Sequence, residues 1–349
     1  MNAGAATEPD LLSVCIPALN EAESLPRLIS QLRSQRDVQL EIIIADGGSN
    51  GRPVATLPAG VKIITAPRGR ALQMNAAART AGGKRLLFLH ADSTLDDPHL
   101  LGGALAALAT AQQAAGNERV AGHFRLRFRR TSGPALLYCY MEAKTALNRP
   151  GTINGDQGLL IERTWFEALG GFDERVPLAE DQDIADRIRA DGQWITLPGT
   201  LETSARRFET LGSVRVFVFM AIIMAMRHTG RDRFLAAVPA LYQTRLRNGR
   251  LNMQAIFAAF RDMQRARPLR ERLRLHYRVG RYVRSNAWQS FFFCDVALGL
   301  KRHPLLAFHD RALAPLLRNP LVDAVSGALT YLWVLVILRM WFIWRDRKQ

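Results

Sequence analysis

Cysteine is scarce in this chain of 349 residues, which contains only three. Cys15, Cys139 and Cys294 lie far apart and lack metal-ligand spacing, so the sequence indicates neither a disulfide framework nor a zinc site and fits a cytosolic protein. Met1 to Asp10 has no basic segment and no apolar run, so we expect no secretory leader. No Gly-x-Gly-x-x-Gly follows any expected strand, which argues against a dinucleotide-dependent dehydrogenase.

Positive charge is abundant and unevenly distributed. The net charge is +16, and the stretch from Ser213 to the last residue holds 24 Lys and Arg against 7 Asp and Glu. The stretch before it is close to neutral. We therefore expect two regions, residues 1–212 and a basic helical region at 213–349, and an anionic partner for the second, either a membrane surface or nucleic acid.

Apolar strands and amphipathic helices alternate through the first region, which predicts an α/β fold with a mostly parallel sheet. Asn20 with Glu23 resembles a capping box and predicts a helix start there, and Asp97 followed by Pro98 predicts another. Val120–Arg129 alternates with a period of two and predicts an antiparallel or edge strand. The buried parallel strands are expected at residues 11–16, 40–45, 61–65 and 86–89.

The apolar run Leu86–Leu89 leads directly into His90, Ala91 and Asp92. Ligands of open α/β sheets bind outside the carboxyl ends of the strands, so an acid at this place is expected to face a cleft. The alternative is a helix cap, but Asp97 fits that role better.

Two further charged groups are candidates for a site. Arg68 and Arg70 precede a helix, where guanidinium groups and free backbone N–H groups can hold a phosphate, although two solvated surface arginines have the same pattern. Glu180 and Asp181 begin another helix, whose positive end stabilises ionised carboxylates.

Six motifs in this order over roughly the first 210 residues resemble those of family 2 glycosyltransferases. The Arg-Gly-Arg form of the third motif is most similar to the bacterial branch known as radical-SAM/selenodomain-associated transferases. The resemblance implies a GT-A fold, a Rossmann-like mostly parallel mixed sheet with flanking helices. The motifs are Pro17-Ala18-Leu19-Asn20-Glu21, Ala45-Asp46-Gly47-Gly48-Ser49, Arg68-Gly69-Arg70-Ala71, His90-Ala91-Asp92, Gly155-Asp156-Gln157-Gly158 and Glu180-Asp181.

The resemblance also implies a role for each matching residue. Asp46 would contact the nucleobase or ribose, Arg68 and Arg70 the diphosphate, and Asp92 a Mg²⁺ or Mn²⁺ ion that bridges the diphosphate. Asp181 would be the general base of an inverting transfer, with Glu180 as the second candidate. The rest of the implied nucleotide-sugar donor site is Pro17, Asn20, Glu21, Gly47 and Ala91, and the implied acceptor site is Asp156, Gln157 and Arg207.

The sequence departs from the family pattern at two places. His90 stands where the family often has a first aspartate, so we expect it to act through its neighbours, and Phe208 stands where relatives carry a tryptophan after Arg207. One alternative enzyme is a nucleotidyltransferase acting on sugar phosphates, which normally has a glycine-rich loop after the first strand. Pro17–Glu21 contains no glycine.

The second region contains a candidate membrane segment at residues 324–344, about 31 Å as a helix and close to the roughly 30 Å hydrocarbon thickness. Arg270, Arg274, Arg278 and Arg281 share one helical face, which suits anionic lipid or a solvated helix. We expect an enzyme at the cytoplasmic face of a membrane with an acceptor carried by lipid, either peripheral or held by one carboxyl-terminal anchor. A non-enzymatic basic protein that binds RNA or membrane is the other alternative, but no recognised nucleic-acid motif supports it.

Overall fold

The computed structural model describes residues 11–50, 60–176, 178–230, 232–246 and 248–348. The segment Met1–Asp10, for which no leader is expected, lies outside them. The chain forms two compact units, the first of residues 1–129 and 141–204 and the second of residues 130–140 and 205–349. The second unit thus begins eight residues before the expected start at 213 and takes in Arg130–Tyr140 as well.

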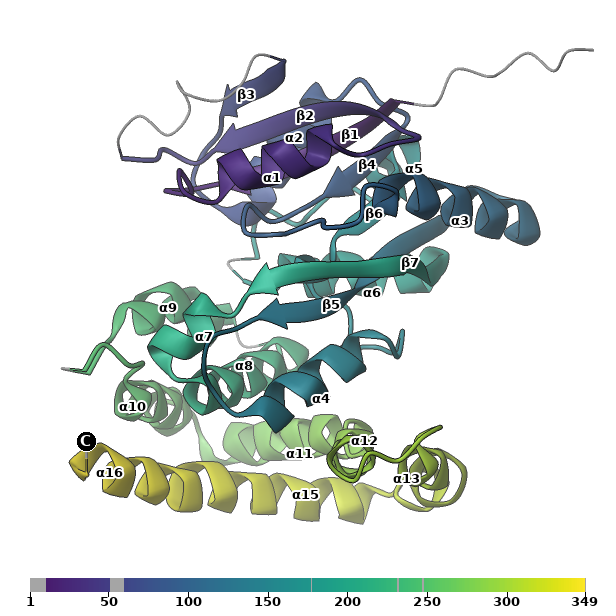
Figure 1. Ribbon diagram of the computed structural model, residues 1–349. Helices are drawn as coiled ribbons and strands as arrows, with labels where there is room; N and C mark the ends of the chain where they lie inside the picture. Colours follow the sequence, from purple (N-terminus) through teal and green to yellow (C-terminus); the bar gives the residue numbers. More distant parts are fainter. Residues whose placement is uncertain (1–10, 51–59, 177, 231, 247, 349) are drawn as a thin grey trace, which may run out of the picture. The chain divides into compact units, whose positions relative to one another are not determined.

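A seven-stranded sheet with the order β3-β2-β1-β4-β6-β5-β7 forms the centre of the first unit (Figure 1). The pairs β3-β2, β2-β1, β1-β4 and β5-β7 are parallel, and β6 is antiparallel to both β4 and β5. This confirms the mostly parallel mixed sheet. The expectation for β5 is largely wrong, because β5 lies inside the sheet, pairs in parallel with β7 along most of its length, and is antiparallel to β6 only at Gly122. The strands are β1 (Leu11–Ala18), β2 (Gln39–Asp46), β3 (Val61–Thr65), β4 (Arg85–Phe88), β5 (Val120–Arg129), β6 (Leu159–Glu162) and β7 (Gln193–Ser204).

The strand register brings distant segments to one edge of the sheet. Ala18 at the end of β1 pairs with Asp46 at the end of β2. Phe88 at the end of β4 pairs with Leu159 at the start of the antiparallel β6. The segment that follows β4 therefore meets the segment that precedes β6.

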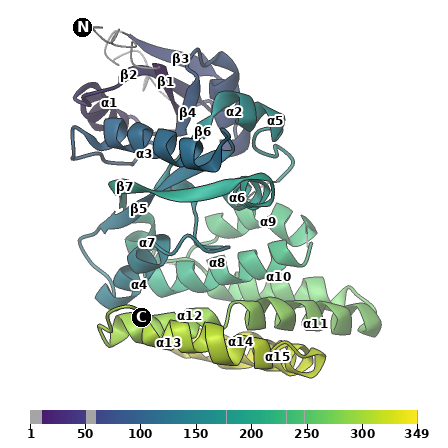
Figure 2. The same cartoon turned by 90° about the vertical axis from the view of Figure 1, so that its right-hand side faces the viewer.

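Helices cover both faces of this sheet. Helices α2, α5 and α6 pack with Cys15, Ile43 and Phe88 on one face, whereas α1 and α3 lie on the other (Figure 2). As the pattern predicts, α1 buries its four aliphatic side chains. The helices are α1 (Leu25–Arg33), α2 (Arg70–Thr80), α3 (Leu100–Ala115), α4 (Ala135–Thr145), the 3-10 helix η1 (Gly155–Gln157), α5 (Arg163–Ala168) and α6 (Glu180–Asp191).

The expected helix start at Asn20 is wrong, whereas the start expected at about Pro98 is two residues early. Asn20 adopts a left-handed conformation with φ 59°, and its backbone N–H donates to Ser49 Oγ at 2.8 Å, so it belongs to a loop and α1 starts at Leu25. Asp97 Oδ1 accepts from the N–H of His99 at 2.8 Å just before α3, as the capping pattern predicts. At Asn20 a long-range hydrogen bond outweighs the local pattern.

The second unit is helical in its described residues. Helix α11 packs along α15, and α10 packs on α16. From residue 205 onward its helices are α7 (Arg206–Leu211), α8 (Ser213–His228), α9 (Asp232–Gln243), α10 (Met253–Arg265), α11 (Leu269–Ser285), α12 (Trp288–Ala297), α13 (Pro304–Phe308), η2 (His309–Leu313), α14 (Ala314–Leu316), α15 (Pro320–Leu332), η3 (Trp333–Leu338) and α16 (Arg339–Arg347).

Helices α15, η3 and α16 form one continuous helix of 28 residues, Pro320–Arg347, here called the terminal helix. Its length and apolar composition are sufficient to cross a membrane. The expected apolar segment 324–344 lies within it.

Candidate active site

The ends of β1 and β2 are linked around Asp46. Its carboxylate accepts hydrogen bonds from the backbone N–H groups of Gly48 and Ser49 at 3.2 and 3.1 Å, and from the Ser49 hydroxyl at 2.5 Å. Asn20 joins the same turn, because its Oδ1 accepts from the N–H of Asn50 at 3.0 Å. The half-buried carboxylate is therefore held in one orientation at the strand end.

Gln73 on α2 supports this edge and was missed by the sequence reasoning. Its buried side-chain amide donates to the carbonyls of Ala18 and Ala45 at 2.7 and 2.8 Å, and its Oε1 accepts from the N–H of Gly69 at 3.4 Å. One side chain thus joins the ends of β1 and β2 to the start of α2. A lone glutamine among the alanines of α2 was the available signal.

The other predicted donor residues near the ends of β1 and β2 have structural contacts. Pro17 is buried within β1, paired with Ala45, and the backbone N–H of Gly47 donates to the Ala18 carbonyl at 2.9 Å. Glu21 accepts a hydrogen bond from Ser24 Oγ at 2.9 Å just before α1. These residues shape the loops beside Asp46.

Arg70 begins α2 and lies among carboxylates. Its guanidinium is 4.0 Å from Glu180 and its side chain is 48% exposed. Partial burial opposes the charge of the guanidinium, but the surrounding carboxylates outweigh this and raise the pKa of Arg70. In decreasing order of effect they are Glu180, Asp156, Asp181 and Asp92. Arg68 is exposed two residues earlier in the chain.

His90 and Asp156 form a close pair between the end of β4 and the start of β6. His90 Nδ1 lies 2.5 Å from Asp156 Oδ1, and the His90 side chain is mostly buried. Gly155 packs directly on the imidazole, because a Cβ added there would lie 2.9 Å from His90 Nε2. The pairing of Phe88 with Leu159 explains why two residues 66 positions apart meet.

Asp181 is bound to the same loop. Its Oδ2 accepts from the N–H of Gly155 at 2.7 Å, and its Oδ1 accepts from the N–H of Gln182 at 2.8 Å. The side chain lies in the first turn of α6 and is half-buried. It is therefore an oriented carboxylate with an accessible part.

Glu180, its neighbour, is almost fully buried, with 7% of its side chain exposed. Burial raises the pKa of Glu180, the Asp181 carboxylate raises it further, and Arg70 acts in the opposite direction. Because Asp181 is more accessible, it fits a contact with an incoming molecule better than Glu180 does.

Gln157 has an interior position. Its side chain is fully buried, and its amide donates to the carbonyls of Phe124 and Thr145 at 3.1 and 3.2 Å and lies 2.9 Å from His123 Nδ1. These contacts stabilise the loop that carries Asp156. His123, a second residue missed from sequence, is buried beneath that loop.

Asp92 is the last of the predicted site residues at this edge of the sheet. Ala91 is buried and Asp92 is half-exposed, in a turn closed by the hydrogen bond from the N–H of Ser93 to the His90 carbonyl at 3.1 Å. The structure therefore brings together Arg70, His90, Asp92, Asp156, Glu180 and Asp181 at one edge of the sheet.

Comparison with known protein families gives a match that lies mostly within the first unit. Residues 13–170 match the model of the family described as Glycosyl transferase family 2. This stretch is therefore similar to a family 2 glycosyltransferase domain. The mostly parallel sheet with flanking helices agrees with the GT-A architecture expected from the sequence. The match is to the family, and no branch within it is distinguished.

Several solved structures are similar to this chain. The mannosyltransferase PcManGT from Pyrobaculum calidifontis, solved with GDP-Man and Mn²⁺, is 18% identical, with 94% of this chain and 88% of that chain covered and a TM-score of 0.46. S. aureus TarS 1–349 is 13% identical, with 94% and 91% covered and a TM-score of 0.44. No curated protein matches the sequence.

GalNAc-T7, solved with UDP, GalNAc and Mn²⁺, is 16% identical with a TM-score of 0.44. Only 56% of this chain is covered in that comparison, and it spans 44% of GalNAc-T7.

The first unit meets the minimal requirement for a divalent ion. No group of three or more His, Cys, Asp or Glu side chains suited to a metal occurs among the residues that the structure describes. Mg²⁺ in nucleotide sites usually binds only one or two carboxylates, and phosphate oxygens and water supply the other ligands. A half-exposed Asp92 at the strand end fits that donor set.

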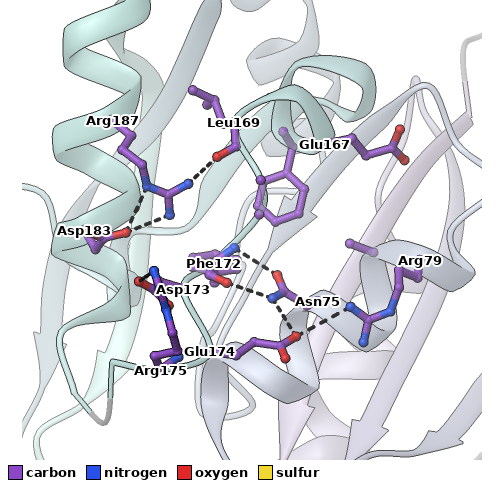
Figure 3. A pocket seen from close by; sticks show the side chains of 14 residues that line it. Asn75, Arg79, Glu167, Leu169, Phe172, Asp173, Glu174, Arg175, Asp183 and Arg187 are labelled. Carbon is purple, nitrogen blue, oxygen red and sulfur yellow. Dashed lines mark hydrogen bonds and ion pairs between the residues drawn. The ribbon is translucent and has the colours of Figure 1, made fainter.

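A separate pocket of about 700 Å³ lies between α2, α5 and α6 (Figure 3). Its charged side chains bind one another: Arg187 pairs with Asp183 at 2.7 Å, and Arg79 with Glu174 at 3.5 Å. Asn75 Oδ1 accepts a hydrogen bond from the backbone N–H of Phe172 at 2.9 Å. The pocket contains none of the predicted site residues. Arg187 Nη1 donates to the Leu169 carbonyl at 2.5 Å and so links α6 to the end of α5.

Arg207 belongs to the second unit, near the start of α7. Its side chain is exposed, and the guanidinium lies 5.7 Å from the centre of the Phe208 ring.

Proposed function

We propose that the first unit transfers a sugar from a nucleotide-sugar donor to an acceptor hydroxyl with inversion, and that Asp181 is the general base. The observation that carries this proposal is the meeting of Arg70, Asp92 and Asp181 at the carboxyl edge of the sheet. A donor diphosphate needs cationic groups, and an acceptor hydroxyl needs a carboxylate that can accept its proton. The cluster contains both.

Donor binding is assigned to the edge formed by β1, β2 and the start of α2. Asp46 is assigned to ribose or base, and the N–H groups of Gly48 and Ser49 that orient its carboxylate support this assignment. Arg70 and the exposed Arg68 are assigned to the diphosphate, which lies near the amino end of α2. Asn20 and Gln73 hold this edge in shape before the donor arrives.

The ion is assigned to Asp92. Mg²⁺ or Mn²⁺ would stabilise the negative charge that develops on the leaving nucleoside diphosphate. The charge of the cluster supports an added cation, because four carboxylates surround the single guanidinium of Arg70. Asp92 would orient and bind the ion, and Arg70 would contribute a second positive group at the same phosphates.

Proton removal is assigned to Asp181. The two N–H groups that bind its carboxylate leave lone pairs free to accept a hydrogen bond from the acceptor hydroxyl. The proton passes to a carboxylate oxygen as the hydroxyl oxygen attacks the anomeric carbon from the face opposite the diphosphate. Glu180, which is buried beside Arg70, would instead balance the charge of that guanidinium.

The acceptor is assigned to the side of the cluster that carries Asp156. The amide of Gln157 faces the interior, so we assign it to support of the loop and not to direct contact. The basic composition of the second unit and its terminal helix favour an acceptor attached to lipid at the cytoplasmic face of a membrane.

The test is a panel of nucleotide sugars, each added with Mn²⁺ and scored first by thermal stabilisation and then by slow hydrolysis to the free sugar. Hydrolysis needs no known acceptor. At least one donor should stabilise the wild type and be hydrolysed. Asp181→Asn should keep the stabilisation and lose most of the turnover, whereas Asp186→Asn, an exposed acid on the same helix, should keep both. Hydrolysis by Asp181→Asn at the wild-type rate would refute the assignment of the base.

A further inference from the structure

The terminal helix has one exposed apolar face, here called the outer stripe. Its members recur every three or four residues from the first turn of the helix to the last, and each is at least 44% exposed. An apolar surface of this extent on a described unit normally has a partner. The outer stripe consists of Leu321, Val325, Leu329, Leu332, Trp333, Val336, Ile337, Met340 and Trp344.

The opposite face of the terminal helix is fixed to the second unit. Gly280 of α11 and Gly327 of α15 meet so closely that a Cβ on either would overlap a carbonyl oxygen of the other helix. One turn further along, the rings of His276 and Tyr331 lie 3.7 Å apart between centroids. Helix α11 therefore lies directly against the middle of the terminal helix.

An ion pair holds each end of the same face. Arg284 of α11 binds Asp323 at 2.5 Å near the start, and Arg215 of α8 binds Asp346 near the end. All four side chains are mostly buried. Since 23 residues of helix rise about 35 Å, the two ion pairs hold nearly the whole rod to the unit.

These attachments are incompatible with a helix that crosses a bilayer alone. A spanning helix would carry its neighbour α11 into the hydrocarbon, because α11 packs along α15, the first part of the terminal helix. Helix α11 exposes a row of arginines, and charged side chains at membrane depth are strongly unfavourable. That row consists of Arg270, Arg274, Arg278 and Arg281.

The charge of the second unit selects the partner of the outer stripe. From Ser213 onward the chain has 24 basic and 7 acidic residues, so two copies of this unit would repel each other, whereas anionic lipid headgroups would attract it. Basic groups also flank the stripe. Lys348 Nζ lies 4.1 Å from the centre of the Trp344 ring, as expected of an aromatic and cationic pair at a membrane interface.

We propose that the terminal helix lies parallel to the surface of an anionic phospholipid bilayer, with the outer stripe immersed and the opposite face bound to its own unit. The protein is then attached to one leaflet and does not span the membrane. This refines the membrane location given in the proposed function. Its test measures the depth of the helix in the bilayer and does not depend on glycosyl transfer. Failure of one would therefore be distinguishable from failure of the other.

The orientation can be measured with two native tryptophans of the outer stripe. Trp333 is at the middle of the terminal helix and Trp344 is near its end. The full chain is bound to vesicles of phosphatidylcholine and phosphatidylglycerol that contain lipid brominated either near the glycerol or near the chain end. Each bromine quenches tryptophans at its own depth, and the variants Trp333→Phe and Trp344→Phe show which residue is quenched.

A parallel helix predicts that shallow bromine quenches both tryptophans to a similar degree, so each variant loses a similar share of the quenching. A spanning helix predicts that deep bromine quenches Trp333 alone, and this result would overturn the proposal. No quenching by either lipid would also overturn it. Formation of a dimer without vesicles, abolished by changes in the stripe, would then identify a second copy as the partner.

Matched substitutions test whether the outer stripe is the surface that contacts lipid. The double variant Leu329→Glu and Leu332→Glu should weaken partitioning onto the mixed vesicles at least tenfold, with unchanged helix content by circular dichroism. Ile63→Glu, a change at an exposed apolar residue of the first unit, should leave partitioning unchanged. Partitioning of the double variant equal to that of the wild type would contradict the proposal.

Discussion

His90 Nδ1 lies 2.5 Å from Asp156 Oδ1, and this contact joins the end of β4 to the loop before β6. The same loop binds Asp181 through the N–H of Gly155 at 2.7 Å. His90 is thus linked to the proposed base Asp181 through two contacts and the adjacent residues Asp156 and Gly155. The family often has a metal-binding aspartate at this place. In this chain His90 instead positions the loop before β6, which contacts the proposed base Asp181.

Breaking the pair should reduce activity without unfolding the protein. We expect His90→Ala to lower turnover about 10- to 100-fold, the range typical of residues that orient functional groups, while nucleoside diphosphate affinity in Mn²⁺ changes less. Steady-state kinetics and calorimetry measure the two effects. His99→Ala is the control, because His99 and Asp37 form a similar pair at 2.7 Å on the exposed surface. An equal loss in both variants would refute a positioning role for His90.

Asp92→Asn should abolish metal-dependent donor binding. The substitution removes one charge from a half-exposed side chain and no apolar contact, so the free energy of unfolding should be nearly unchanged. Calorimetric titration with nucleoside diphosphate, with Mn²⁺ and with chelator, measures the effect. Asp96→Asn, four residues away and exposed, should bind as the wild type does. If Asp92→Asn binds normally in Mn²⁺, Asp92 is not the metal ligand.

The two acids at the start of α6 should respond differently. Asp181→Asn should lower turnover by about 10² to 10⁴, the usual contribution of a general base, and keep donor affinity. Glu180→Gln should mainly weaken donor binding, because it removes the carboxylate 4.0 Å from Arg70. Single-turnover rates and donor affinity separate these outcomes. The reverse pattern would assign the base to Glu180.

Stability should depend on pH through His123. Burial lowers the pKa of this histidine to about 4, and Arg189 contributes in the same direction, whereas the Phe124 carbonyl partly opposes it. In the unfolded chain the pKa is about 6.5, so the folded state binds fewer protons between these values. The free energy of unfolding should therefore fall as pH decreases from about 6.5 to 4, by up to about 3 kcal/mol.

Urea unfolding at several pH values measures this slope. His123→Gln, which keeps a polar side chain near Gln157, should show a clearly smaller slope than the wild type. His99→Gln, a change at an exposed histidine, should not alter it. An unchanged slope in His123→Gln would mean that other groups cause the acid sensitivity.

The sequence predicted the positions of the strands better than it predicted the start of α1. Runs such as Leu86–Leu89 are decided by local composition, and the sheet confirms them. The start of α1 depends on the hydrogen bond from Asn20 to Ser49, which joins residues 29 positions apart. No local pattern contains that information.

The candidate site shows the same division. Its acids and arginines were found because their residue types and order resemble a family pattern. Gln73 and His123 were missed because their importance comes from buried contacts with other elements. The apolar length of the terminal helix was likewise readable, but its attachment through Gly280, Asp323 and Asp346 was not.

The most direct test of the central claim is donor binding to the full chain measured with and without Mn²⁺ across a panel of nucleotide sugars. The account predicts that at least one nucleotide sugar binds, that chelation weakens its binding, and that Asp92→Asn removes the dependence on metal. Absence of binding to every nucleotide sugar and nucleoside diphosphate, together with tight salt-sensitive binding to RNA, would contradict it.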